Sequence, residues 1–272
     1  MNRIRSLIVL GLALAAGLIA PAVRAAPPLE TGTPGELRVA YRTDDKPISF
    51  LQDGQPAGLL IDLTNSIAER LGLHVTYVST TFAAMVPAVR NHLYDTAAFG
   101  VLVTPERQAV VNFTSAIGYG QAQLVSRKSA SLAKLEDAAG KTVAVTTGSA
   151  LIPLLQQIAP RVTVKQFPNI ASSINALVAG QIDGLFTGLA TAERVVEQHP
   201  DLVATQTVES GVNALPVAKD RPGLLAALDR AIAAAMKDGT YTRLFTKWNP
   251  PTMAIPERLF SDYPGMPRPA AR

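Results

Sequence analysis

A unit of helix, short turn, aspartate, strand and glycine occurs twice in this chain. Residues 88–95 (AVRNHLYD) resemble residues 176–183 (ALVAGQID), and five positions after each copy comes a glycine, Gly100 or Gly188. The two copies lie 88 positions apart. Such a repeat predicts two similar α/β lobes. A ligand of a protein built this way binds between the lobes, at the carboxyl ends of the strands.

After the first copy, the chain passes from a strand into the start of a helix. Thr104 is a favourable N-cap, Pro105 fits the first helical position, and Glu106 suits the positive end of the helix. Arg107 does not suit that end, because a cation in the first turn opposes the helix dipole. Free backbone N–H groups and a guanidinium at one place predict an anion-binding site. The alternative is an exposed arginine with a partner on the surface.

The N-terminal segment has the pattern of a secretory signal. Arg3 and Arg5 precede an apolar run over residues 7–19, and after Pro21 the residues Val23-Arg24-Ala25 fit the small-residue rule for a cleavage site. This pattern predicts cleavage after Ala25 and a periplasmic product. The apolar run is short for a transmembrane helix. Residues 26–35 are rich in Pro, Gly and Thr, and we expect them to form a flexible leader.

Charge and cysteine content exclude several classes of function. Residues 1–25 contain three arginines and no acidic residue, so the net charge of +4 falls to +1 in the remainder of the chain. This balance provides no basic field for nucleic acid or for a membrane surface. The sequence contains no cysteine, which excludes disulfides, zinc-thiolate sites and thiol nucleophiles. No His or acidic cluster has metal-ligand spacing, so we expect no metal and no cofactor.

An ordered series of segments covering about 36–249 resembles the family 3 periplasmic solute-binding proteins, which deliver polar amino acids to ABC importers. The segments are 37–40 with Pro47 and Phe50, 58–71, 82–88, 104–107 with 112–114, 148–149, 179–183, 238–241 and 247–248. The resemblance implies an α/β, two-lobed periplasmic binding protein fold of type II. Its lobes would be joined by two hinge strands, near 118–121 and 210–212.

The hinge positions imply the domain boundaries. Lobe 1 would consist of residues 36–120 and 212–250, and lobe 2 of residues 121–211. Residues 251–272 are rich in proline and show no clear periodicity. We expect this proline-rich tail to be partly disordered or laid on the surface.

The resemblance also implies a binding pattern in lobe 1. Arg107 matches the arginine that grips the ligand carboxylate, and Phe82 matches the aromatic residue that packs on the ligand. Gly100 and the backbone of Leu102 match the strand end beside that arginine. Relatives often have Ser or Thr where Leu102 stands, so this chain lacks one hydroxyl donor.

In lobe 2 the resemblance implies one match and one departure. Thr146 and Ser149 match positions at a strand-to-helix turn that can reach the same carboxylate. Gly188 departs from the pattern, because amino-acid binders of the family typically carry an aspartate there for the α-ammonium group. A glycine cannot pair a buried cation, which is expensive to leave unpaired. Thr187 beside it offers only a hydroxyl.

The first loop contains Arg42, Asp44 and Asp45. Either one of these aspartates takes the ammonium group, or the ligand has none. Family members specific for glutamate and aspartate have an arginine at the position of Arg42. Arg42 and Arg107 would then hold the two ends of a dicarboxylate. The alternative is a surface Arg42 paired with Asp44 or Asp45.

We therefore predict a monomeric, non-enzymatic binding protein that captures a small carboxylate, namely a polar or acidic amino acid, for the membrane subunits of an ABC importer. One alternative is a dehydratase-like enzyme acting on cyclohexadienyl acids, which needs an acid or base in the cleft. Asp45 is the one acid that we expect there. A second alternative is an orphan two-lobed receptor or sensor partner with a non-amino-acid ligand, which Gly188 and Leu102 favour.

Overall fold

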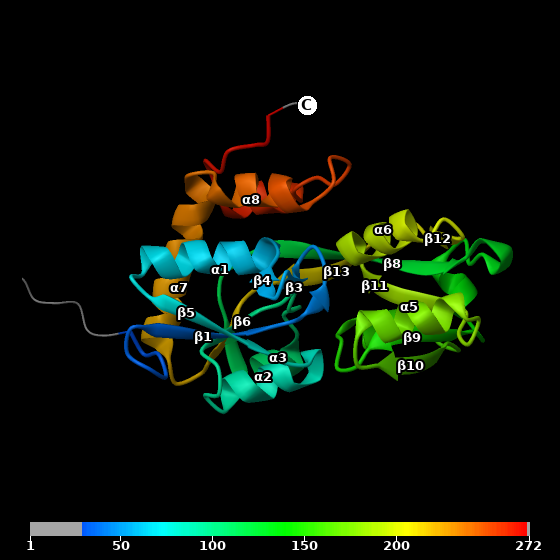
Figure 1. Ribbon diagram of the computed structural model, residues 1–272, viewed down its shortest axis with the longest axis horizontal. Helices are drawn as coiled ribbons and strands as arrows, with labels where there is room; N and C mark the ends of the chain where they lie inside the picture. The colour runs from blue at the N-terminus through cyan, green and yellow to red at the C-terminus, as the bar shows by residue number, and fades with distance from the viewer. Residues whose placement is uncertain (1–28, 271–272) are drawn as a thin grey trace, which may run out of the picture.

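A computed structural model describes residues 29–270 and contains two α/β lobes lying side by side (Figure 1). This arrangement confirms the predicted two-lobed fold. The predicted signal peptide, residues 1–25, lies outside the described residues, as does the beginning of the predicted leader. Within residues 29–270, none of the helices combines the length and the apolar character needed to cross a membrane.

Lobe 1 is built on a parallel sheet with the order β5-β1-β6. In this sheet β1 (Glu36–Tyr41) lies between β5 (His74–Ser79) and β6 (Thr96–Ala98). Side chains of β1 alternate between two faces, as expected for a strand, so that Val39 packs toward α1 and Ala40 toward α2. The helices of this lobe are α1 (Leu59–Arg70), α2 (Phe82–Arg90), α3 (Pro105–Gln108), α7 (Pro222–Lys237) and α8 (Thr240–Trp248). Its smaller strands are β2 (Asp44–Asp45), β3 (Ser49–Gln52), β4 (Gln55–Ala57), β7 (Val111–Phe113) and β14 (Pro216–Ala218).

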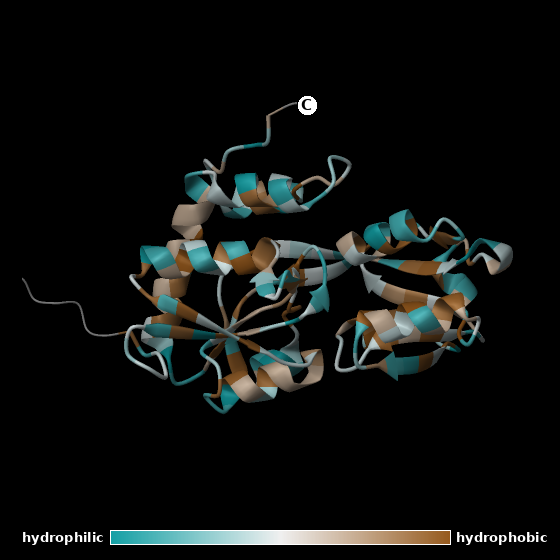
Figure 2. Cartoon of the chain, viewed as in Figure 1, coloured by the Kyte–Doolittle hydropathy of each residue, from teal (hydrophilic) through white to brown (hydrophobic). Residues whose placement is uncertain are grey.

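Lobe 2 repeats this order and adds antiparallel strands. Its sheet has the order β10-β9-β11-β8-β12, and its first three strands are parallel, like those of lobe 1. The strands are β8 (Gly118–Arg127), β9 (Thr142–Thr146), β10 (Thr163–Phe167), β11 (Gly184–Gly188) and β12 (Leu202–Ala204). The helices are α4 (Leu151–Ile158), α5 (Ile170–Val178) and α6 (Leu189–Gln198), with 3-10 turns at Lys128–Ala130 and Leu135–Ala138. Figure 2 shows hydrophobic residues along the central strands β9 and β11 of lobe 2, and a mixture of hydrophobic and hydrophilic residues along β1 of lobe 1.

The repeated aspartates perform the same task in both lobes. The Oδ2 atom of Asp95 accepts a hydrogen bond from the backbone N–H of Arg38 at 2.8 Å, and that of Asp183 accepts one from Thr142 at 2.8 Å. Each aspartate also donates its own N–H to the carbonyl oxygen of the same partner. The aspartate therefore joins β6 to β1 in lobe 1 and β11 to β9 in lobe 2. In lobe 1, Asp95 forms an additional ion pair with Arg221.

Two strands run side by side between the lobes (Figure 1). They are β8 and β13 (Val208–Asn213), which pair antiparallel with Gly120 opposite Gly211. They lie where the sequence predicts the hinge crossings. A Cβ atom at Gly120 would lie 2.5 Å from the Ser210 Oγ atom and 2.9 Å from the Leu102 Cδ2 atom, so a side chain at this position would displace both groups.

The described part of the proline-rich segment, residues 251–270, packs on lobe 1. It contains the short helix α9 (Glu257–Asp262), whose Leu259 is fully buried. Ile255 and Met266 are buried in the same core cluster. The sequence does not predict this helix, because its six residues are too few to show a helical period. The sequence predicts that this segment is partly disordered or laid on the surface. In the structure, residues 251–270 lie against lobe 1 and bury three side chains in its core.

Candidate functional site

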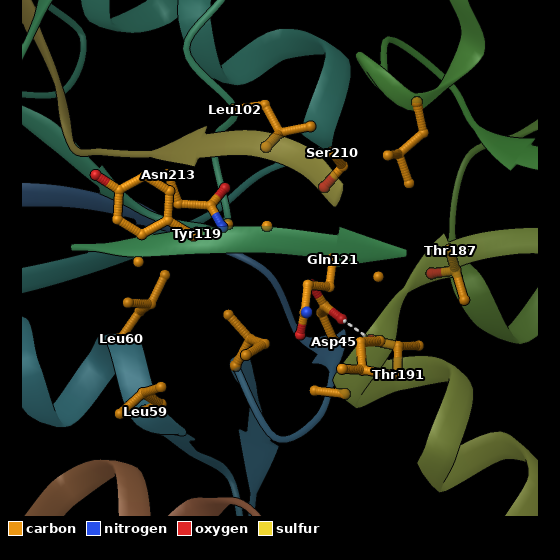
Figure 3. Close-up of a pocket in the computed structure, with 18 of the residues that line it drawn as sticks. Asp45, Leu59, Leu60, Leu102, Tyr119, Gln121, Thr187, Thr191, Ser210 and Asn213 are labelled. Atoms are coloured by element: carbon orange, nitrogen blue, oxygen red, sulfur yellow. Dashed lines mark hydrogen bonds between the residues drawn. The ribbon is translucent and has the colours of Figure 1, made fainter. Parts of the chain in front are cut away.

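A cavity of about 210 Å³ lies between the two lobes and around the hinge strand β8 (Figure 3). Its lining contains every residue that the sequence predicts for the site: Arg42, Asp45, Phe82, Gly100, Leu102, Arg107, Thr146, Ser149 and Thr187. Gly188 also lines it. The elements that supply these residues end at the cleft between the lobes, as expected for the carboxyl ends of parallel strands.

Arg107 is a half-buried cation held by carbonyl oxygens. Thr104 caps the N-terminus of α3, which confirms the helix start predicted there. The Arg107 guanidinium donates to the Leu102 oxygen at 2.7 Å and, across the cleft, to the Gly148 oxygen at 3.0 Å. Burial lowers the pKa of Arg107 and the charge of Glu106 raises it, but the group stays protonated at neutral pH. Among residues 29–270, no carboxylate lies within ion-pair distance of Arg107, so its positive charge is available to an anion.

Gly148 lets lobe 2 reach Arg107. It has φ +77°, and a Cβ atom there would lie 3.0 Å from the Ala83 Cα atom of lobe 1. Only glycine accepts both the backbone angle and this contact without strain. In the same turn, the Ser149 N–H donates to the Thr146 oxygen at 3.0 Å. This turn thereby carries the predicted lobe 2 residues to the cavity.

Arg42 is buried, with 6% of its surface exposed, and its charge is already paired. Its guanidinium donates to Asp44 Oδ1 from Nη2 at 2.9 Å and from Nε at 3.1 Å, and its Nη1 lies 3.7 Å from Asp45 Oδ2. The alternative interpretation of the sequence, in which Arg42 pairs with Asp44 or Asp45, is therefore right about the pairing. It is wrong about the location, because Arg42 is buried. Because Asp44 neutralises it, Arg42 is not a free anchor for a second ligand carboxylate.

The first loop also bridges the two lobes. The second oxygen of Asp44 accepts from the N–H of Ile170, at the start of α5, at 2.9 Å. Asp45 accepts from the Thr191 hydroxyl in α6 at 2.7 Å, the contact drawn in Figure 3. Sequence reasoning did not identify Thr191, because its role depends on a contact with a residue 146 positions away.

Phe82 lies between the two arginines of the site. Its ring centroid is 5.9 Å from the Arg42 Cζ atom and 5.4 Å from the Arg107 Cζ atom. Phe99 supports the ring edge-on from behind at 5.9 Å. A cation over an aromatic face is attracted to it, so Phe82 orients both guanidinium groups.

Replacing Phe82 with leucine is expected to lower ligand affinity about 5- to 30-fold, since each cation–π contact contributes about 0.5–1 kcal/mol. Isothermal titration calorimetry with the tightest-binding amino acid measures this effect. Phe82→Tyr keeps the aromatic face and should stay within about threefold of the wild-type affinity. Equal affinities in the Leu and Tyr variants would show that the ring does not position the arginines.

The position of Gly188 is open. An added Cβ atom would have the Gln121 oxygen at 3.9 Å as its nearest neighbour.

A further polar group of the lining is Asn213, whose Oδ1 is buried and has no hydrogen-bond partner within the described chain. Such an acceptor is suited to a donor on a ligand. The signal for Asn213 in the sequence was a polar residue between Val212 and Ala214, next to the predicted hinge.

The charges of the site balance as one cation and one anion. Arg42, Asp45 and Arg107 are the charged residues among those of residues 29–270 that line the cavity, and Asp44 neutralises Arg42. This leaves a positive pole at Arg107 and a negative pole at Asp45. Residues 29–270 contain no group of three or more His, Cys, Asp or Glu side chains placed to hold a metal ion.

Comparisons with known proteins agree on one family. The sequence model of the bacterial extracellular solute-binding proteins, family 3, matches residues 37–251. An ABC transporter arginine-binding protein of Escherichia coli (strain K12) is 28% identical over 200 residues, which cover 71% of this chain and 82% of that protein.

Solved structures show the same similarity. An ancestral arginine-binding protein bound to arginine superposes with a TM-score of 0.74 at 31% identity, over 79% of this chain and 98% of the other. An ancestral amino acid-binding protein that is a precursor of cyclohexadienyl dehydratase superposes equally well, with a TM-score of 0.74 at 28% identity over 79% of this chain and 96% of the other.

Proposed function

Because the chain belongs to family 3 of the bacterial extracellular solute-binding proteins, we propose that it captures an α-amino acid in the periplasm and delivers it to an ABC importer. The observation that carries this proposal is the Arg107 guanidinium. It is directed at the cleft, is held by carbonyl oxygens of both lobes and lacks a carboxylate partner within residues 29–270. A ligand carboxylate supplies that partner in a charge-assisted, bidentate geometry.

The balance of charge supports a zwitterionic ligand. Arg107 receives the carboxylate, and Asp45 receives the ammonium group that the family's usual aspartate would bind at position 188. Asp45 keeps free acceptor capacity beside its bond to Thr191 and its 3.7 Å contact with the Arg42 Nη1 atom, because a carboxylate has about four lone-pair sites. The acidic amino acid predicted from the sequence required a free Arg42, and the pairing of Arg42 with Asp44 argues against it.

Non-enzymatic binding is also the simpler use of this cavity. None of the three histidines, which all lie within the described residues, lines it, and Asp45 supplies the one carboxyl group among the described lining residues. Two lobes that close on a ligand need no reaction chemistry. They need a closed state that gains contacts from both sides when the ligand binds.

A calorimetric screen tests the function. The panel contains neutral, acidic and basic amino acids, succinate, and the same amino acids with a blocked amino group. We expect a neutral α-amino acid to bind tightest and its amino-blocked form to lose most of the affinity. Tightest binding of succinate would restore the dicarboxylate hypothesis. Absence of binding throughout the panel would favour an orphan receptor, and turnover of a cyclohexadienyl acid would show an enzyme.

Placing an acid at position 188 tests whether the ligand is an amino acid or a carboxylate without an ammonium group. Gly188 has ordinary extended backbone angles, φ −60° and ψ 148°, and is the N-cap of α6, where aspartate is favoured. Gly188→Asp is therefore expected to fold, to bind α-amino acids about as tightly as the wild type or up to about tenfold tighter, and to bind succinate about tenfold or more weakly. Calorimetry measures both ligands. Tighter succinate binding in this variant would contradict the proposed placement of the ammonium group.

A further inference from the structure

The cavity extends past the hinge strand into an apolar arm. We define this arm by its lining residues, Leu59, Leu60, Tyr241, Phe245, Met253 and Pro256. In Figure 3, Leu59 and Leu60 lie on one side of β8, and Leu102, Ser210 and Asn213 lie on the other. The positive and negative poles of the site and this arm belong to one continuous cavity.

One wall of the arm comes from residues 250–266, which we call the C-terminal strap. Met253 and Pro256 of the strap line the cavity, yet they lie beyond residue 251, where the match to the family model ends. The strap therefore alters a binding site whose other walls come from the matched part of the chain.

The strap is firmly attached to lobe 1 and to the hinge. Leu259 is buried in the lobe 1 core. The Tyr263 hydroxyl donates to the Ala116 oxygen at 2.7 Å, the Tyr119 hydroxyl of β8 is hydrogen-bonded to Asp262, and the Arg258 guanidinium lies 4.7 Å from the centroid of the Tyr119 ring. These contacts attach the strap to lobe 1 through residues 258–263, and the Met253 N–H donates to the Pro250 oxygen at 3.0 Å in the turn before them.

The chemistry of the arm selects what can enter it. Apart from the Tyr241 hydroxyl, the six residues that define the arm present carbon and sulfur atoms, and none of them is charged. Asn249 lines the cavity beside them, and its side-chain amide already donates to the Phe245 carbonyl oxygen at 3.0 Å. A charged ligand side chain would lose its water there and find no partner, which is costly, whereas an apolar side chain would gain by burial. We propose that the strap determines specificity, and that the arm which it closes receives the apolar side chain of the amino acid whose carboxylate Arg107 binds. This inference rests on the function proposed above.

A charge placed on the strap tests the inference. Met253→Lys places an ammonium group at the wall of the arm, and Thr252→Lys places the same group on the exposed neighbouring residue outside the lining. The probes are alanine, leucine, methionine and phenylalanine, titrated calorimetrically into the full-length mature protein. We expect Met253→Lys to weaken the three larger ligands at least tenfold and to leave alanine within threefold. Thr252→Lys should change none of them.

A second variant tests the same wall in case Met253→Lys does not fold. Met253→Ala removes part of the wall without adding charge, and we expect it to shift the preference toward phenylalanine by at least threefold relative to leucine. If each of the four probes binds the wild type and both Met253 variants with the same affinity, the inference is overturned and the proposed function stays intact. If wild-type protein binds alanine but none of the three larger apolar probes, the inference also fails. If no amino acid binds the wild type, both proposals fail.

Discussion

Replacing Arg107 with alanine is expected to weaken amino-acid binding by about 30-fold or more. Truncating one partner of a buried, hydrogen-bonded charge pair costs about 2–5 kcal/mol, and each 1.4 kcal/mol is a tenfold change in affinity. The loss is large here because Arg107 is the one unpaired cation among the described lining residues, and because its carbonyl contacts fix the direction of the guanidinium. Isothermal titration calorimetry with the best ligand of the screen measures the effect.

Two further variants interpret this result. Arg107→Lys keeps the charge but loses the bidentate fork, so its affinity should fall between those of the wild type and the alanine variant. Arg230→Ala removes an exposed arginine of α7 that does not line the cavity and should leave the affinity unchanged. Full retention of affinity in Arg107→Ala would remove the central support for the proposed function.

Replacing Asp95 with alanine is expected to give the largest loss of stability, about 3–5 kcal/mol. Asp95 is 2% exposed, forms an ion pair with Arg221, and accepts from the N–H groups of Gly32 and Arg38 at 2.8 Å each. Its removal leaves a mostly buried guanidinium and two backbone donors without their acceptor. At about 2–4 °C per kcal/mol for a chain of this size, the melting temperature should fall by about 6–20 °C in a thermal melt followed by circular dichroism.

The repeat provides a matched control within the same protein. Asp183 accepts from the Thr142 N–H as Asp95 does from Arg38, but no ion pair of Asp183 is found among the described residues. Asp183→Ala should therefore cost only about 1–2 kcal/mol. Equal losses in the two variants would mean that the ion pair with Arg221 contributes nothing to the stability of lobe 1.

Most of the fold could be predicted from the sequence, because the patterns that indicate it lie within short segments of the chain. The 88-residue repeat corresponds to three parallel strands arranged in the same order in both lobes, and the helix start at Thr104 is capped as its residue types require. The predicted site residues meet in one cavity because they lie at or near strand ends and helix starts that face the cleft. Residue type and spacing are sufficient to recognise such positions.

The features that the sequence did not reveal depend on contacts between distant segments. Whether Arg42 was a ligand anchor or a paired residue could not be decided from two aspartates within three positions. Its burial and the bond from Asp44 to Ile170 of lobe 2 decide it in the structure. The packing of α9 is a similar case, because the pocket that receives Leu259 is assembled from helices far away in the sequence.

The attachment of the strap to β8 also determines where the molecule bends. Tyr119 and the Ala116 carbonyl are tied to α9, so the lobe 1 end of this strand cannot easily change its backbone angles. The next pair along, Gly120 and Gly211, lacks side chains, and Gly211 has φ +124°. We therefore expect rotation of the lobes to be concentrated at this glycine pair. Gly120 lines the cavity, so a small rotation there would move lobe 2 over the lobe 1 surface and change the height of the ligand chamber, while its apolar floor would stay in place.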